Sequence, residues 1–328
     1  MAGVELIAVD ADEDGMRVDR WFKAHYPGLG FGALQKLLRS GQVRVDGGRV
    51  KSDTRLKSGQ NVRVPPMKAD AAGRGGAMTA YSMRNTGDAD ALGKMTLFED
   101  AKVLVINKPP GLSVQGGSNV HRHVDGMLEA LRNKKGEKPR LVHRLDRDTS
   151  GVLMIATSRG AAQKLAEAFR ARDTQKTYWA LVKGTPPKAE GTIKSWLLKE
   201  QTPDGDRMAV VRHGVKGAVQ AISNYRLVEK AGQRLSWLEL EPYTGRTHQL
   251  RVHCLQMGCP IIGDPKYFDD DVNWDFPGGI QKKLHLHAHS LKIPHPSGGL
   301  INVTAPMPQH MVQSWNLLGL DEASAAET

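Results

Sequence analysis

The residues best suited to chemistry lie between Leu141 and Met154, in the sequence LVHRLDRDTSGVLM. The polar middle of this stretch places the carboxylate of Asp146 between Arg144 and Arg147. Neighbouring cations favour the ionised form of a carboxylate, so Asp146 is expected to be charged at neutral pH. An ionised carboxylate at the edge of a buried strand can act as a nucleophile. A salt-bridged loop that precedes a strand explains the same residues equally well.

Strand-like segments surround this stretch and would position it. Residues 152–156 form the longest apolar run of the chain, and residues 103–106, 178–182, 221–227 and 235–240 have similar strand character. If residues 143–146 are extended, Arg144 and Asp146 share one face. The clearest helical pattern is at residues 161–172. Strands outnumber helices without regular βαβ alternation, which predicts an α+β fold over residues 96–320: a mixed, largely antiparallel sheet flanked by helices.

The positive charge of the chain is concentrated near its N-terminus. The 328-residue chain has a formal net charge of +11, and residues 16–68 contain 12 Lys and Arg against 3 Asp, a net charge of +9. A cluster of one sign is typical of a protein that binds a polyanion. The region has no strongly amphipathic basic helix with an aromatic face, so nucleic acid is favoured over a membrane as the partner.

The same region has a compact pattern of elements. Two helices are predicted within residues 16–40, a hairpin around Asp46-Gly47, and a short strand at residues 61–64. The run from Phe31 to Pro66 resembles an S4-type RNA-binding domain. The resemblance implies a small α/β RNA-binding domain at residues 1–65, in which Lys36, Arg39 and Arg44 contact RNA. Residues 66–95 show no period and are expected to be a linker of low order, and residues 321–328 a disordered tail.

Four motifs in the larger part of the chain resemble the pseudouridine synthase family that includes the ribosomal large-subunit enzymes. They are NKPPG at residues 107–111, HRLDRDTSG at 143–151, KTYWALVKG at 176–184 and TGRTHQLRVH at 244–253, in family order over about 150 residues. The resemblance implies an isomerase that converts uridine to pseudouridine without a cofactor. The expected substrate is structured RNA, and specifically large-subunit (23S) ribosomal RNA.

The family resemblance also implies roles for individual side chains. Asp146 would attack the uridine, at C1′ of the sugar or at C6 of the base. Tyr178 would pack on the base and is a candidate to take the proton from C5. Arg251 would pair with Asp146, Arg246 would contact a phosphate or a loop, and Arg144 would fill the gap left by the extruded uridine. The uridine must leave the stack, because neither C1′ nor C5 can be reached inside a helix.

The choice of Arg251 over Arg246 depends on the local structure. On a strand, Arg251 would share one face with Gln249 and His253, while His248 and Leu250 would point the other way. Leu250 is expected to belong to the core.

Two other functions fit parts of the sequence. The charge distribution also suits a non-catalytic RNA-binding or ribosome-assembly factor. His285, His287 and His289 alternate, so on a strand they would share a face and could bind zinc in a hydrolase. That run contains no carboxylate or thiol, so a metal is not expected. Cys254 and Cys259 are expected to be reduced thiols. No targeting or membrane-spanning segment is recognisable, which predicts a cytoplasmic protein. The absence of a cofactor motif suggests a monomer that acts on RNA alone.

Overall fold

The computed structural model divides the chain into two compact units, Met1–Gly87 and Asp88–Thr328. Each unit has its own hydrophobic core. The structure describes residues 4–9, 13–26, 29–66, 78–117, 120, 122–133, 136–171, 173–202, 205–268, 274, 276 and 278–325. In the described parts of the chain, no helix is long and apolar enough to cross a membrane.

The first unit contains two helices and a small sheet. The helices are α1 (Val18–His25) and α2 (Phe31–Arg39), and the strands β1 (Glu5–Ala8), β2 (Arg44–Val45), β3 (Gly48–Arg49) and β4 (Asn61–Val64) lie in the order β1-β4-β2-β3. Asp46 and Gly47 both have positive φ, as the tight turn between β2 and β3 requires. The predicted helices, hairpin and strand are confirmed, whereas the assignment to the S4 family stays a prediction.

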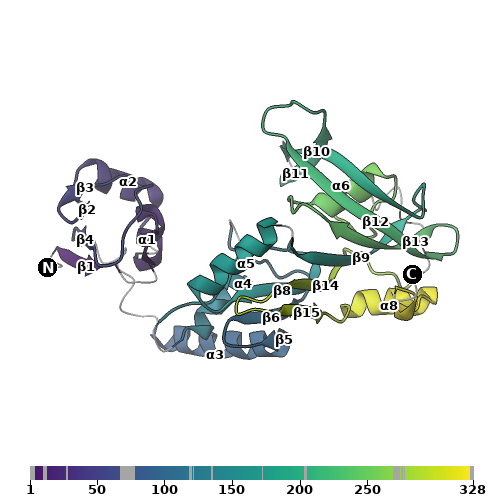
Figure 1. Ribbon diagram of the computed structural model, residues 1–328, viewed down its shortest axis with the longest axis horizontal. Coiled ribbons are helices and arrows are strands. Elements are labelled where there is room, and N and C mark those ends of the chain that lie inside the picture. The colour runs from purple at the N-terminus through teal and green to yellow at the C-terminus, as the bar shows by residue number, and fades with distance from the viewer. Residues whose placement is uncertain are drawn as a thin grey trace. The chain divides into compact units, whose positions relative to one another are not determined.

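The second unit is built on a large sheet, which among the described residues has 11 strands (Figure 1). Its strand order is β11-β10-β12-β13-β9-β14-β8-β6-β5, with β15 beside β14 and β7 beside β8. Every strand pair is antiparallel except β14 with β8. The predicted α+β class with a mixed, largely antiparallel sheet is confirmed. The strands are β5 (Thr96–Glu99), β6 (Val103–Lys108), β7 (Arg140–Leu141), β8 (Ser150–Ala156), β9 (Gln175–Lys183), β10 (Glu190–Thr202), β11 (Gly205–Val211), β12 (Val219–Ala231), β13 (Leu235–Pro242), β14 (Leu286–Pro294) and β15 (Leu300–Thr304).

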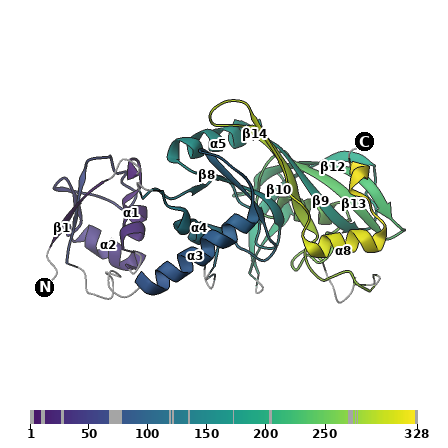
Figure 2. The same cartoon turned by 90° about the horizontal axis from the view of Figure 1, so that it is seen from below.

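Helices cover both faces of the sheet (Figure 2). They are α3 (Met78–Met95), α4 (Val124–Met127), α5 (Arg159–Ala171), α6 (Gln249–Gln256) and α8 (Gln309–Leu318), with 3-10 turns at Leu128–Leu131 and Glu322–Ala325. Alternate residues of β8 point to opposite faces. Leu153 and Ile155 pack with α3 and α4, while Met154 and Ala156 pack with α5.

The other half of the sheet is sandwiched in the same way. Trp179 and Leu181 of β9 pack with α8 on one face, and Ala180 and Val182 pack with α6 on the other. Strand β9 therefore carries α6 on its Ala180 face, and α6 is the helix that contributes Arg251.

Two expectations about loosely ordered segments need correction. Residues 78–95 of the expected linker form helix α3, because Leu92 is buried in the core and Ala91 and Met95 pack beside it. Residues 67–77 of that linker lie outside the described residues. The expected disordered tail contains the 3-10 turn Glu322–Ala325, where Arg226 Nη2 donates to the carbonyl of Ala325 at 3.1 Å. Residues 326–328 of the tail also lie outside the described residues.

Buried histidines predict that acid destabilises the second unit. Burial is the largest cause that lowers the pKa of His253, His285, His287 and His289 from 6.5 to about 4. The unfolded chain therefore binds more protons than the folded protein between about pH 6.5 and pH 4. Each such histidine lowers the free energy of unfolding by about 1.4 kcal/mol per pH unit in this window.

The measurement is guanidinium-induced unfolding of the full chain at several pH values. We expect the free energy of unfolding to fall steadily from pH 6.5 toward pH 4. The variant His289→Gln should weaken this dependence, whereas His213→Asn, at an exposed position, should leave it unchanged. A free energy of unfolding that stays constant between pH 6.5 and pH 5 would contradict the prediction.

Candidate active site

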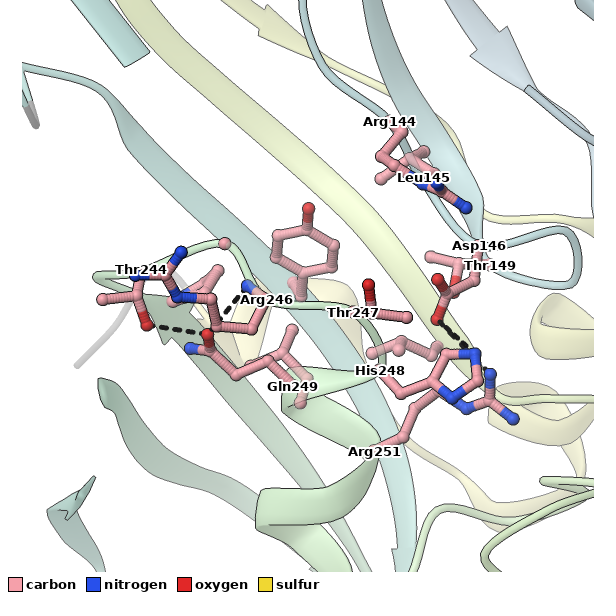
Figure 3. Close-up of a pocket in the computed structure, with 15 residues that line it drawn as sticks. Arg144, Leu145, Asp146, Thr149, Thr244, Arg246, Thr247, His248, Gln249 and Arg251 are labelled. Atoms are coloured by element: carbon pink, nitrogen blue, oxygen red, sulfur yellow. Dashed lines mark hydrogen bonds and ion pairs between the residues drawn. The ribbon is translucent and has the colours of Figure 1, made fainter. Parts of the chain in front are cut away.

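A cavity of about 130 Å³ brings the predicted site residues together (Figure 3). Its lining comes from the loop before β8, from β9 and β14, and from the segment that enters α6. Arg144, Asp146, Tyr178, Arg246 and Arg251 all line it, although they are up to 107 positions apart in the sequence. The remaining lining residues are Leu145, Thr149, Pro242, Thr244, Gly245, Thr247, His248, Gln249, Leu250 and Leu286.

Asp146 is held by a buried arginine. Arg251 Nη1 donates to Asp146 Oδ2 at 3.3 Å, and the Arg251 side chain is only 4% exposed. The same guanidinium makes two bonds to Asp264: Nε to Oδ2 at 2.7 Å and Nη2 to Oδ1 at 2.6 Å. Burial by itself would lower the pKa of Arg251, but the hydrogen bonds and charge of Asp264, followed by those of Asp146, outweigh it and raise the pKa. Arg251 is therefore a permanent cation that keeps Asp146 oriented.

The segment that carries Arg251 is a helix, so the predicted strand at this point is wrong. Helix α6 begins at Gln249, after His248 in a left-handed conformation with φ 52°. Gln249 accepts from Thr244 and from the backbone N–H of Arg246, and donates to Ile222 and Ser223 of β12. These bonds hold the turn that precedes α6 against β12. Leu250 is buried in the core, as expected.

The loop that carries Asp146 is anchored on both sides. On one side, the backbone N–H of Met154 donates to His143 Nε2 at 2.8 Å, and burial, followed by the charge of Lys176, lowers the pKa of His143 to about 3. On the other side, Lys108 of the NKPPG motif donates to the carbonyls of Pro109, Leu112 and Arg147, each at 2.9 Å. Burial lowers the pKa of Lys108 to about 7, against the charges of Asp148 and Asp146. The loop is thus tied to β6 and β8.

Gly151 allows β8 to lie against β14. Its φ is 109°, and a Cβ atom at this position would lie 2.2 Å from the carbonyl oxygen of Ala288. Ser150, the preceding residue, bonds His287 Nδ1 through its Oγ at 2.9 Å. The Thr-Ser-Gly part of the motif is therefore a close approach between two strands, and it sets where the Asp146 loop ends and β8 begins.

Tyr178 lies in the same cavity, on strand β9. Burial, and then the charge of Asp146, raises the pKa of its phenol. Tyr178 therefore keeps its proton at neutral pH. Its ring borders the cavity together with Leu286 of β14.

His248 faces Asp146 from the other side. Its Nε2 lies 3.9 Å from Asp146 Oδ2, and its Nδ1 lies 2.9 Å from the Tyr267 hydroxyl. That hydroxyl also accepts from the backbone N–H of Met208 at 2.8 Å. Burial is the main cause that lowers the pKa of His248. The imidazole therefore lies between the Asp146 carboxylate and the Tyr267 hydroxyl.

The remaining predicted arginines are more exposed. Arg144 lines the cavity and makes no hydrogen bond or ion pair within the described residues. Arg246 donates through Nε to the carbonyl of Gln220 at 3.1 Å, so it contacts the protein backbone.

One of the three predicted RNA-binding residues of the first unit borders a hollow within that unit. Arg39 lines this hollow with Arg17, Arg49 and Lys51. Arg44 makes hydrogen bonds to the carbonyls of Gly41 and Gly47 on the adjacent hairpin. Lys36 lies in the last turn of α2, one turn of helix before Arg39.

The alternating histidines have structural partners. His285 contacts Ser314 and the carbonyl of Lys283, and His287 contacts Ser150 and the carbonyl of Ala305. Both rings are fully buried. Within the described residues, no group of three His, Cys, Asp or Glu side chains is arranged to hold a metal ion. These contacts do not support the hydrolase alternative. Cys254 and Cys259 are free and buried.

Sequence reasoning missed Asp264, His248, Lys108 and His143 as parts of the site. Lys108 and His143 lie inside motifs that had been identified. For Lys108, a usable signal was its position directly after an apolar strand. Asp264 lies 13 positions after Arg251 in an ordinary Gly-Asp-Pro turn. No spacing rule links it to Arg251, because the chain returns through a turn and not along one element.

The chain is similar to known proteins of one family. Residues 102–256 match the family model described as RNA pseudouridylate synthase. Ribosomal large subunit pseudouridine synthase C of Haemophilus influenzae is 36% identical over 300 residues, covering 91% of this chain and 89% of the relative. The protein of the same name from Escherichia coli is 35% identical, covering 93% of this chain and 94% of the relative.

A solved structure is similar to this chain as well. Human RNA Pseudouridylate Synthase Domain Containing 4 superposes with a TM-score of 0.61 at 30% identity, and covers 74% of this chain and 98% of its own. In the sequence, the basic N-terminal module and residues 114–118 had resembled synthase C most, with the relative labelled D as the near competitor. The similarity to proteins named synthase C is confirmed.

Replacing Gly151 should disrupt the approach of β8 to β14. We expect Gly151→Ala to lower the free energy of unfolding by about 3 kcal/mol or more, because the added methyl meets backbone at a positive φ. Denaturant unfolding measures the change. Gly160→Ala is the matched control, because a Cβ there meets nothing within 4 Å. A helical alanine should stabilise by up to about 1 kcal/mol. Equal stability of both variants would contradict the assignment.

Removing the charge of Asp264 should leave Arg251 buried without its main partner. We expect Asp264→Asn to lower the free energy of unfolding by about 3 kcal/mol, as for other broken buried pairs. Glu239→Gln is the matched control, because it breaks the more exposed pair with Arg226 and should cost less than about 1 kcal/mol. If Asp264→Asn is no more harmful than this control, the buried pair does not determine the site.

Proposed function

The chain belongs to the RNA pseudouridylate synthase family and is an isomerase that acts on RNA, and we propose that it converts uridines of large-subunit ribosomal RNA with Asp146 as the nucleophile. The observation that carries this proposal is the Asp146–Arg251–Asp264 arrangement at the wall of a cavity bordered by Tyr178. The substrate class comes from the relatives, which are named for the ribosomal large subunit.

The proposed reaction begins with a bond between a carboxylate oxygen of Asp146 and the uridine. Attack at C1′ expels uracil through N1, whereas attack at C6 adds the carboxylate to the ring before the glycosidic bond breaks. In either case the freed uracil turns, C5 bonds to C1′, and Asp146 is released. The C5 proton is lost and N1 gains a proton, so the product is an isomer of the substrate. No redox step or outside group enters this balance.

Tyr178 suits the packing role better than the role of base at the start of the reaction. Its pKa is raised by burial and then by the charge of Asp146, so the phenol begins as a neutral ring that can stack on uracil. Once Asp146 is bonded to the substrate, its negative charge is gone and one of the two causes of the raised pKa disappears. Proton removal from C5 by Tyr178 therefore becomes easier only after the covalent step.

Arg144 is placed to serve the extruded uridine. The side chain is exposed at the mouth of the cavity and has no partner among the described residues. A planar guanidinium can stack on bases where the uridine has left, and unstacking one nucleotide costs on the order of a few kcal/mol. Phosphate contacts can offset this cost. In the first unit, Lys36, Arg39 and Arg44 are proposed to supply such contacts.

Replacing Asp146 tests the nucleophile. We expect Asp146→Asn to abolish pseudouridine formation while RNA affinity and the thermal unfolding midpoint stay close to wild type, because an amide keeps the shape but is no nucleophile. Pseudouridine in large-subunit ribosomal RNA is mapped by carbodiimide treatment and primer extension, in cells with the wild-type protein, without it, or with the variant.

The matched control is Asp125→Asn, at a carboxylate paired with Lys138 outside the cavity; it should retain all modifications. Wild-type levels of pseudouridine with Asp146→Asn would exclude Asp146 as the nucleophile. If no large-subunit uridine loses its modification when the protein is absent, the proposed substrate is wrong.

A further inference from the structure

A second and larger cavity opens directly beside the first. Its volume is about 530 Å³, against about 130 Å³ for the cavity that borders Tyr178. Both cavities share four lining residues, which are Arg144, Asp146, His248 and Arg251. Asp146 therefore lies where the two cavities meet.

The second cavity is strongly cationic. Five cations line it against two carboxylates: Arg144, Arg147, Arg207, Arg251 and Lys266 against Asp146 and Asp148. Arg251 pairs with Asp146, and Arg147 with Asp148. This leaves Arg144, Arg207 and Lys266 without a carboxylate partner among the described residues. Unbalanced positive charge around a cavity favours an anion as its occupant.

Arg207 is positioned by an aromatic ring. Its guanidinium carbon lies 5.4 Å from the centre of the Tyr267 ring, and that of Arg251 lies 5.1 Å from the same centre. Arg207 Nε is buried and has no hydrogen-bond partner within the described residues. A buried guanidinium N–H without a partner is costly unless a ligand accepts its hydrogen bond.

Lys266 comes to the cavity from the turn that follows Asp264. Its backbone N–H donates to Asp264 Oδ1 at 2.9 Å, and its Nζ donates to the carbonyl of Asp206 at 2.7 Å. An ammonium group has three donors, so two remain for a ligand. Lys266 links the hairpin β10–β11, which carries Arg207, to the turn that holds Arg251.

A third cavity adjoins the second. It has a volume of about 340 Å³ and shares Arg147, Asp148 and Pro265 with the second cavity. Lys282 and Lys283 also line the third cavity but not the second, and both are exposed. The three cavities therefore form a continuous track that starts at Tyr178, passes Asp146, and becomes lined by lysines.

We propose that this track binds the RNA strand on one side of the reacting uridine, with Arg207 and Lys266 holding the adjacent phosphate and Lys282 and Lys283 the next. The inference rests on the proposed function, because it takes the uridine to be bound at Asp146. A phosphodiester must leave the ribose on each side, and the second cavity receives one of them. Arg207 and Lys266 are then positioning residues that seat the ribose against Asp146.

The first test measures binding and needs no turnover. The double variant Arg207→Gln/Lys266→Gln is compared with wild type by filter binding to a large-subunit ribosomal RNA transcript over a range of salt concentrations. We expect about tenfold weaker binding for each lost contact, and a plot of log affinity against log salt that is shallower by about one unit. Because the two side chains seat the ribose against Asp146, the rate of pseudouridine formation at saturating RNA should fall as well.

The matched control removes an equal amount of positive charge, at the end of strands β9, β12 and β13 that lies away from the second cavity. Lys188→Gln/Lys230→Gln changes two exposed lysines at that end of the sheet and should leave the salt slope unchanged. If Arg207→Gln/Lys266→Gln unfolds at a lower temperature, Lys266→Gln alone carries the test, because that side chain bonds only a backbone carbonyl. A wild-type salt slope in a folded variant overturns the proposal.

A second test identifies the phosphate. Synthetic RNAs carry a neutral methylphosphonate either 5′ or 3′ of the reacting uridine, and their affinities are measured for wild type and for Arg207→Gln. We expect Arg207→Gln to lower the RNA affinity when the methylphosphonate is on one side of the uridine, and to have no effect when it is on the other side. Equal losses with both overturn the proposal. A different outcome separates the two proposals. If Arg207→Gln weakens RNA binding as expected but the wild-type protein forms no pseudouridine, the proposed function is contradicted and the RNA track is still supported.

Discussion

The site depends on a buried arginine that must serve two carboxylates. Arg251 and Asp264 are almost completely removed from water, and two charges pay for burial only when their geometry satisfies both. The bidentate contact with Asp264 uses Nε and Nη2, so Nη1 remains for Asp146. The rigid fork of the guanidinium therefore sets the direction from which Asp146 is held. A lysine could not do this, because its ammonium is a single point of charge.

The surrounding fold supplies the three supports that this arrangement needs. Strand β8 places the Asp146 loop, because Gly151 lets it approach β14 and His143 bonds its backbone. Lys108 ties the same loop to the NKPPG turn. Helix α6 places Arg251 because Gln249 holds the preceding turn against β12. All three supports include polar contacts that are at least partly buried, and such contacts favour one geometry because leaving them unmade is expensive.

The electrostatics divide the site into two functions. Near Tyr178, the neutral phenol and Leu286 border a small cavity suited to a base. Beyond Asp146, Arg207 and Lys266 have no carboxylate partner among the described residues, and the cavity is larger. Asp146 lies where the two meet. This division fits an enzyme that acts on one nucleotide within a polyanionic chain, since the base and its phosphates need different surroundings.

The sequence by itself determined the class of fold, the strands around the Asp146 loop, and the family to which the chain belongs. Alternating apolar residues report strands, and the four motifs keep their order. It also placed Asp146, Tyr178 and Arg251 in one site, through the resemblance. The strand predicted at residues 249–253 is a helix, because the segment follows a turn that Gln249 stabilises. Helix α3 and the turn at Glu322–Ala325 were not predicted, because tertiary packing orders sequences that have no clear period. Only the tertiary structure decided that Asp264 completes the ion pair and that Arg207 and Lys266 flank Asp146. These residues meet through turns and a hairpin that are distant in sequence, and no local pattern encodes contacts of that kind.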